Sequence, residues 1–110
     1  NPDLIVHRGN KEEYCAGYIA KIFEDIGGSV VYYGKPYKEI YNMCFKVNEK
    51  VLAIGDNLRT DIKGANNLKI DCLFITDGVH RNEYKNISDL DVLLKKYRVE
   101  ANVFQKELSW

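Results

Sequence analysis

Residues 53–65 read "AIGDNLRTDIKGA", and this stretch decides the fold. The apolar run 51–54 enters it, and such a run is typical of a strand that is covered on both faces. The turn that follows holds two carboxylates, Asp56 and Asp61, before residues recur at the spacing of one helical face: Ile62, Ala65 and Leu68. The stretch therefore predicts a buried strand, a short acidic turn and a helix.

The same alternation of strand and helix extends in both directions along the chain. Upstream, residues 4–7 and 29–33 are β-prone, and between them an apolar face at helical spacing predicts a helix over 15–26. The run 29–33 leads through Gly34-Lys35-Pro36 into a helix with the apolar residues Ile40, Tyr41, Cys44 and Phe45.

Downstream, residues 72–75 form a further apolar strand. A polar loop follows, and Ser88-Asp89-Leu90-Asp91 resembles a capping box that opens a helix to Tyr97. The last dozen residues are too mixed to assign. Strands that alternate with helices predict a parallel sheet, and ligands of such sheets bind beyond the carboxyl ends of the strands.

The residues expected at these strand ends suit a phosphate and metal site. Asp56 can supply a hard oxygen donor to Mg²⁺, and Lys35 can supply a compact positive charge to a phosphate oxygen. Asp61 can orient metal-bound water or the Lys35 ammonium without binding the metal itself. The plain alternatives stay open: Asp61 is also an acceptable residue at a helix start, and Lys35 alone is also compatible with a solvated surface lysine.

These segments also resemble a known family. "YYGKPYKEIY" and "VLAIGDNLRTDIKGANNLKIDCLFITDGV" are similar to the third and fourth motifs of the haloacid-dehalogenase-like (HAD) phosphatases, in the NagD-like subclass IIA, and "NPDLIV" is similar to the stretch that closes their cap. The resemblance implies that Lys35 binds phosphate, that Asp56 binds Mg²⁺ and that Asp61 is the second acid. It also implies a set of residues at the edge of the substrate site: Asn1, Asp3, Gly34 and Asn57.

The resemblance implies a fold and its boundaries as well. We expect an α/β fold in which residues 34–110 form a partial doubly wound parallel sheet, the carboxyl-terminal half of a HAD-like Rossmannoid core. Residues 1–33 are expected to be the end of an α/β cap, as strand, helix and strand.

One part of the family pattern is missing from the sequence. Family members carry an Asp-x-Asp nucleophile motif after an apolar strand, and here only Asp89-Leu90-Asp91 has that spacing, within the expected helix cap. We therefore expect a fragment of a Mg²⁺-dependent phosphatase that is inactive alone, acting on a phosphorylated small molecule when its amino-terminal half is supplied. Without that half, the strand 51–54 becomes an exposed sheet edge, available for self-association.

Two other classes of protein share features with this sequence. A receiver-type signalling domain also combines acids with a lysine, but its acceptor aspartate precedes the lysine, whereas Lys35 precedes Asp56. A non-catalytic interaction or dimerisation module derived from the same fold remains open, because such a protein tolerates the loss of a nucleophile.

Composition narrows the setting further. The 110 residues contain 16 Lys and Arg and 16 Asp and Glu, so no basic excess indicates nucleic acid. No run approaches the roughly 18 apolar residues of a membrane span, and three widely spaced cysteines predict no disulfide framework, so we expect a cytoplasmic protein without a membrane partner. His80, within a polar loop, is expected at the surface or at the substrate edge.

Overall fold

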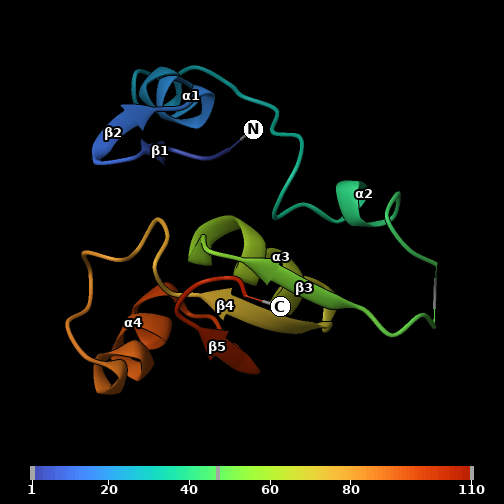
Figure 1. The fold of residues 1–110 in the computed structure, drawn as a ribbon. Helices are drawn as coiled ribbons and strands as arrows, with labels where there is room; N and C mark the ends of the chain where they lie inside the picture. The colour runs from blue at the N-terminus through green and yellow to red at the C-terminus, as the bar shows by residue number, and fades with distance from the viewer. Residues whose placement is uncertain (1, 47, 110) are drawn as a thin grey trace.

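The computed structural model describes residues 2–46 and 48–109, which form two structured parts (Figure 1). The first part contains β1 (Ile5–Arg8), β2 (Lys11–Tyr14) and α1 (Ala16–Asp25). The second part contains, in chain order, α2 (Lys38–Tyr41), β3 (Leu52–Gly55), a π-helical turn η1 (Leu58–Ile62), α3 (Lys63–Leu68), β4 (Asp71–Ile75), a 3-10 turn η2 (Ile87–Asp89), α4 (Leu90–Tyr97) and β5 (Val103–Gln105).

The second part is built on a parallel sheet of the order β3-β4-β5, with β4 in the middle (Figure 1). Residue Leu52 of β3 pairs with Asp71 of β4, and Leu73 of β4 pairs with Val103 of β5. The connection from β3 to β4 runs through η1 and α3, and the connection from β4 to β5 runs through α4. The predicted α/β fold with a parallel sheet is confirmed.

The core of the molecule lies between this sheet and the helices that connect its strands. Its buried apolar side chains come from η1, α3, β4, α4 and the segment after α4: Leu58, Ile62, Ala65, Cys72, Phe74, Leu90, Leu93 and Val99. Alternate residues of β4 contribute two of these side chains, Cys72 and Phe74. The core therefore anchors η1, the turn that follows the acidic residue Asp56.

The edge strand β3 is exposed on one side. Its hydrogen-bonded neighbour in the described residues is β4, and no described strand pairs with its other edge. Leu52 is 52% exposed and Ile54 is 42% exposed, although the continuous apolar run predicted cover on both faces. This edge of β3 is therefore free to pair with another strand.

The first part is a hairpin followed by an amphipathic helix. Strands β1 and β2 pair antiparallel through Gly9 and Asn10, with Gly9 at φ +61°. The predicted helix is present as α1, but its apolar face remains largely exposed, at Ile19, Ile22, Phe23 and Ile26. Periodicity thus identified the helix correctly, whereas most of that face is left uncovered by the described residues.

The prediction of a strand over residues 29–33 is wrong. These β-branched and aromatic residues have no regular secondary structure in the described chain. A strand needs a hydrogen-bonding neighbour, and none of the described strands pairs with residues 29–33. The expected cap ending of strand, helix and strand is therefore observed as a hairpin and a helix, while the boundary between cap and core at residues 33 and 34 stays a prediction.

The predicted capping box lies two residues earlier than expected. Asn86 and Asp89 form it at the start of η2, and Asp89 Oδ2 accepts hydrogen bonds from the amides of Lys85 and Asn86.

The helix predicted after Pro36 is a single turn, α2, and ends at Tyr41. No helix in residues 2–46 and 48–109 is both long and apolar enough to cross a membrane.

Candidate active site

The predicted convergence of polar residues occurs at the carboxyl ends of β3 and β4. Asp56 follows the last residue of β3, and the loop 76–79 follows β4. The amide of Val79 donates a hydrogen bond to Asp56 Oδ2 over 3.0 Å. Within the described residues, Asp56 Oδ1 accepts no hydrogen bond from a side chain or an amide, so this oxygen is available to a ligand.

Asp61 accepts hydrogen bonds from two amides of this turn and from Lys35. Its Oδ2 atom accepts hydrogen bonds from the amides of Asp56 (3.2 Å) and Asn57 (3.1 Å), and its Oδ1 atom accepts one from Lys35 Nζ. Asp61 is buried, with 8% of the residue exposed, whereas the Lys35 side chain is 49% exposed. Lys35 and Asp61, which are 26 residues apart in the chain, therefore form an ion pair beside Asp56, as the sequence led us to expect.

The environment keeps Lys35 positively charged. Partial burial lowers the pKa of Lys35, but the hydrogen bond and the charge of Asp61 raise it more, so the pKa lies above its ordinary value. A lysine with one face on Asp61 and half of its surface exposed retains donors for an anion. The arrangement suits a phosphate oxygen.

Two glycines make this close packing possible. A Cβ atom on Gly55 would lie 2.3 Å from Asp61 Cγ, and a Cβ atom on Gly78 would lie 2.2 Å from Asp56 Oδ2. Neither contact is tolerable, so the carboxylates occupy the space that a larger residue would fill. The close neighbour that the glycine before Asp56 admits is therefore Asp61.

Asn57 connects the acidic turn to the first part of the chain. Its Oδ1 atom accepts a hydrogen bond from the Arg59 amide over 2.9 Å and caps η1, while its Nδ2 atom donates to Asp3 Oδ1 over 3.0 Å. Gly34 has φ +101°, which favours glycine, and lies directly before Lys35. Asn1, the remaining residue expected at the substrate edge, lies outside the described residues.

A cavity of about 390 Å³ lies at this junction and is lined from both parts of the chain. Its lining includes the predicted residues Asp3, Lys35, Asp56, Asn57 and Asp61. The structure therefore brings together the described site residues around one space, except Gly34, which does not line it.

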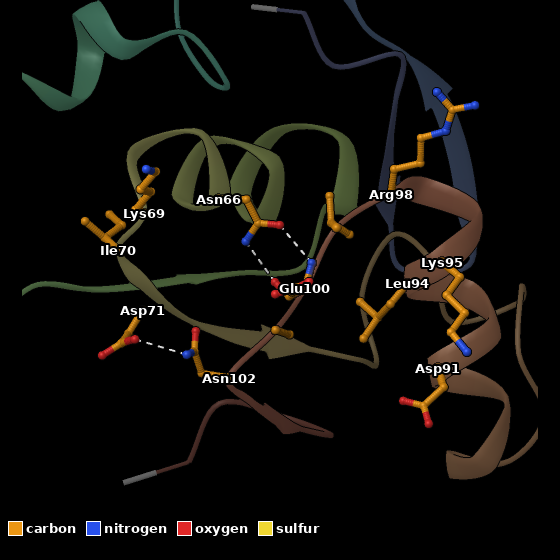
Figure 2. A pocket seen from close by; sticks show the side chains of 12 residues that line it. Asn66, Lys69, Ile70, Asp71, Asp91, Leu94, Lys95, Arg98, Glu100 and Asn102 are labelled. Carbon is orange, nitrogen blue, oxygen red and sulfur yellow. Dashed lines mark hydrogen bonds between the residues drawn. The ribbon is translucent and has the colours of Figure 1, made fainter.

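A larger pocket of about 1000 Å³ lies elsewhere, near the amino end of β4 and the ends of α3 and α4 (Figure 2). None of the predicted site residues lines it. Four of its lining residues bind one another in pairs: the side chain of Asn66 bonds both backbone groups of Glu100, and Asn102 Nδ2 donates to Asp71 Oδ1 (Figure 2). Because parallel sheets bind ligands at the other edge, this pocket is not the candidate site.

The donor set fits part of a Mg²⁺ site. Asp56 offers one carboxylate oxygen at a strand end, and Mg²⁺ commonly binds one or two carboxylates and retains several waters. The described residues contain no cluster of three or more His, Cys, Asp or Glu side chains that could hold a metal by itself. Asp56 would therefore supply one carboxylate of such a site, with waters among the remaining ligands.

Sequence reasoning missed two buried residues beside this turn. His80 has no exposed surface, contrary to its expected place at the surface or substrate edge. Its Nε2 atom accepts a hydrogen bond from the Leu58 amide, so the polar loop after β4 folds inward at this point. A lone histidine in a polar loop carries no sequence signal for such burial.

Thr60 is the second buried residue that sequence reasoning missed. It is 3% exposed, lines the cavity, and its hydroxyl is buried without a hydrogen-bond partner in the described chain. A buried hydroxyl without a partner costs free energy, so it marks a place where water or a ligand oxygen can bind. In the sequence, a threonine at this position indicates no more than a suitable helix start.

Comparisons with known proteins agree with this geometry. The family model described as HAD-hydrolase-like matches residues 32–95. A haloacid-dehalogenase-like hydrolase from Brucella suis 1330 has a similar structure, with a TM-score of 0.75 and 28% identity over 99% of this chain and 42% of that one. No curated protein matches the sequence.

Two further solved structures share the fold at lower identity. A possible sugar phosphatase of the HAD superfamily from Cytophaga hutchinsonii has a TM-score of 0.73 and 21% identity over 98% of this chain and 40% of that one. The p-nitrophenyl phosphatase from Archaeoglobus fulgidus has a TM-score of 0.67 and 18% identity over 97% of this chain and 41% of that one. The chain thus spans about two fifths of the length of these structures.

A parallel sheet connected by helices, with a lysine and two aspartates near its carboxyl edge, defines a Rossmannoid α/β fold. The chain belongs to the HAD-like hydrolase family.

Proposed function

We propose that this chain is the carboxyl-terminal part of a Mg²⁺-dependent phosphatase of the NagD-like branch, which hydrolyses phosphate monoesters through a phospho-aspartate. The observation that carries the proposal is the contact of Lys35 with Asp61 directly beside Asp56, at the strand ends where a parallel sheet binds its ligand. Family membership and the solved phosphatases of the same fold support it.

Each residue has a distinct task in this proposal. Lys35 binds a phosphate oxygen, and Asp61 holds the Lys35 ammonium and the two amides of the turn in place. Asp56 would hold Mg²⁺, which when bound neutralises charge on the phosphoryl oxygens. Asp3 and Asn57 line the same cavity from two parts of the chain, at the edge where the rest of the substrate would lie.

The proposal also holds that the chain is inactive alone. The one pair with the spacing of a nucleophile motif is Asp89 and Asp91, and Asp89 is engaged by the amides of Lys85 and Asn86 as a cap. Covalent phosphoryl transfer requires a nucleophile in line with the phosphorus, and no Asp-x-Asp motif follows an apolar strand in this sequence. The nucleophile would come from an amino-terminal polypeptide that pairs with the free edge of β3.

Hydrolysis of p-nitrophenyl phosphate with Mg²⁺ tests the proposal, with the chain alone and after mixing with a polypeptide that supplies the missing motifs. Activity only in the mixture is expected. Activity of the chain alone would refute the proposal that it is an inactive fragment. No activity in either sample would refute the proposal of a complementing half-enzyme and favour the second candidate.

The second candidate is a non-catalytic interaction or dimerisation module derived from this fold. The exposed side chains of Leu52 and Ile54 on the free edge of β3 favour it, because such edges pair readily with other strands. A folding stability that does not respond to Mg²⁺ would support this candidate over a half-enzyme, since a metal that binds only the folded state stabilises it.

We also propose a cytoplasmic location. The cysteines of the described chain are unpaired, which suits a reducing compartment.

A further inference from the structure

His80 joins two loops at the carboxyl edge of the sheet. Its ring is fully buried and lies 4.7 Å, centroid to centroid, from the ring of Tyr97 in an edge-on arrangement. The Nε2 atom accepts a hydrogen bond from the Leu58 amide over 3.1 Å, and Nδ1 lies 2.6 Å from Glu83 Oε1. Both ring nitrogens therefore have a partner.

These two contacts determine the tautomer. An amide can only donate, so Nε2 must be unprotonated to accept from Leu58. The proton is then on Nδ1 and is donated to the Glu83 carboxylate. Glu83 in turn accepts hydrogen bonds from Lys96 Nζ (2.6 Å) and from the Tyr97 hydroxyl, both on α4. Two residues of α4, Lys96 and Tyr97, thus hold the orientation of His80 through Glu83.

The bond to Leu58 is unusual within the acidic turn. The amides of Asp56 and Asn57 bond to Asp61, and those of residues 59–62 bond to the side chain or carbonyl of Asn57. Among residues 56–62, Leu58 is the one whose amide bonds to a group outside the turn. Removal of that acceptor would leave a buried amide unpaired at the first residue of η1.

The preceding residue makes the complementary contact. Val79 donates its amide to the Asp56 carboxylate, while His80 accepts from the Leu58 amide. Two consecutive residues of one loop therefore hold the turn on both sides of Asn57, one through a donor and one through an acceptor. Rotation of the turn would break both bonds.

We propose that His80 is a positioning residue that fixes the Asp56 turn through its Nε2 acceptor. Its relevance to metal and phosphate binding rests on the proposed function, but the contact itself does not. Glu83 acts through His80 by holding the proton on Nδ1, so the loop after β4 and helix α4 together set the direction of the Asp56 carboxylate.

The tautomer tests the proposal without any substitution. The chain has two histidines, so a ¹⁵N spectrum of the full chain contains two imidazoles, and the His7→Gln variant identifies the signal of His80. We expect a neutral ring with the proton on Nδ1 at pH 7.5. A ring with the proton on Nε2 would overturn the proposal.

Two substitutions test the positioning itself. His80→Phe keeps an aromatic ring without an acceptor, and His80→Gln can place an amide oxygen near the position of Nε2. We expect amide exchange of Leu58 to be about tenfold faster in His80→Phe, the loss of roughly one hydrogen bond, with the Asp56 and Asn57 amide shifts changed and largely restored in His80→Gln. Unchanged exchange and shifts in a folded His80→Phe variant would overturn the proposal.

Binding of Mn²⁺ alone to the full chain separates this proposal from the proposed function. If the wild-type chain binds Mn²⁺ through Asp56, His80→Phe should weaken binding several-fold and His80→Gln should recover it. If the wild-type chain binds no metal, the proposed metal site fails, while the tautomer and exchange measurements still decide the role of His80. Equal Mn²⁺ affinity of wild type and His80→Phe would contradict the positioning role.

Discussion

Asp61 accepts hydrogen bonds from three groups that would otherwise be separate: the Lys35 ammonium and the amides of Asp56 and Asn57. The residue types and spacing within the turn and the lysine after the preceding loop made this contact predictable. The burial of His80 was not predictable, because it depends on Leu58 and Glu83 meeting the ring from two other segments of the chain.

The substitution Asp61→Asn should destabilise the chain. Its amide group cannot accept from the Lys35 ammonium and the turn amides together, so we expect the free energy of unfolding to fall by about 1 to 3 kcal/mol in urea denaturation. Asp91→Asn, an exposed aspartate of α4, is the matched control and should change it by less than about 0.5 kcal/mol. Equal effects of the two substitutions would contradict the role given to Asp61.

The substitution Thr60→Val should stabilise the chain. It removes a buried hydroxyl that lacks a partner and keeps the side-chain volume, so a gain of about 1 kcal/mol and a midpoint of thermal unfolding several degrees higher are expected. Thr60→Ser keeps the hydroxyl and loses a methyl group, and should be less stable than wild type. A clear loss of stability in Thr60→Val would show that the hydroxyl binds water or a ligand oxygen.

At the scale of elements, strong local patterns were predictable and pairing was not. The helix α1 and the strands β3 and β4 follow from periodicity and apolar runs. The strand β2 is polar and was missed, although Gly9-Asn10 between two short extended runs is a hairpin signal. The three-residue strand β5 exists because β4 offers an edge to it, which composition does not reveal.

The approach of the loop after β4 to the Asp56 turn predicts an effect of Gly78→Ala. A Cβ atom would lie 2.2 Å from Asp56 Oδ2, so we expect the Val79 amide signal to shift and stability to fall by about 1 to 3 kcal/mol. In Gly27→Ala the new Cβ meets open space but the φ of +92° is strained, so stability should fall without a shift of Val79. An unchanged Val79 signal in Gly78→Ala would contradict the close approach.

The contact between this loop and α4 makes stability dependent on pH. Burial lowers the pKa of His80, and the neighbouring Glu83 and Asp56 offset this only partly while Arg59 adds to it. The unfolded chain therefore binds the proton more readily than the folded chain, and stability should fall as the pH drops below about 6.5.

Glu83 adds a second acid-labile contribution. Burial raises the pKa of Glu83, but hydrogen bonds from Lys96, His80 and Tyr97 lower it to about 2. A depressed pKa stabilises the folded chain above the unfolded value, near 4.5, and this contribution is lost as the pH falls toward 2.

Urea unfolding at pH 7.5, 5.5 and 3.5 measures both contributions. Stability should decrease at each step, and Glu83→Gln should flatten the step from 5.5 to 3.5, whereas Glu107→Gln, an exposed glutamate, should not. A profile that does not change between wild type and Glu83→Gln would contradict the network on His80.

At the scale of the whole molecule, the class of fold was predictable from the sequence, whereas the groups that cover the exposed apolar surfaces were not. The free edge of β3 and the apolar face of α1 have no partner in the described residues. A sequence pattern records which face is apolar, while the partner of that face is a property of the assembly.

The free edge predicts self-association of the chain alone. Ile54 is 42% exposed on β3, and a lysine there should oppose strand pairing. We expect light scattering to show dimers or larger species that become monomers in Ile54→Lys, but not in Val92→Lys, which changes an exposed valine of α4. A wild-type chain that stays monomeric at high concentration would contradict pairing through this edge.

The central claim is that Lys35 and Asp56 belong to a working phosphate and metal site. The most direct measurement is Mg²⁺-dependent hydrolysis of p-nitrophenyl phosphate by the chain mixed with its missing half, comparing wild type with Lys35→Met and Asp56→Asn, and with Lys38→Met as the control on an exposed lysine of α2. The account predicts that the first two lower kcat by about a hundredfold or more and that Lys38→Met retains activity. Activity that persists in Asp56→Asn or Lys35→Met would contradict it.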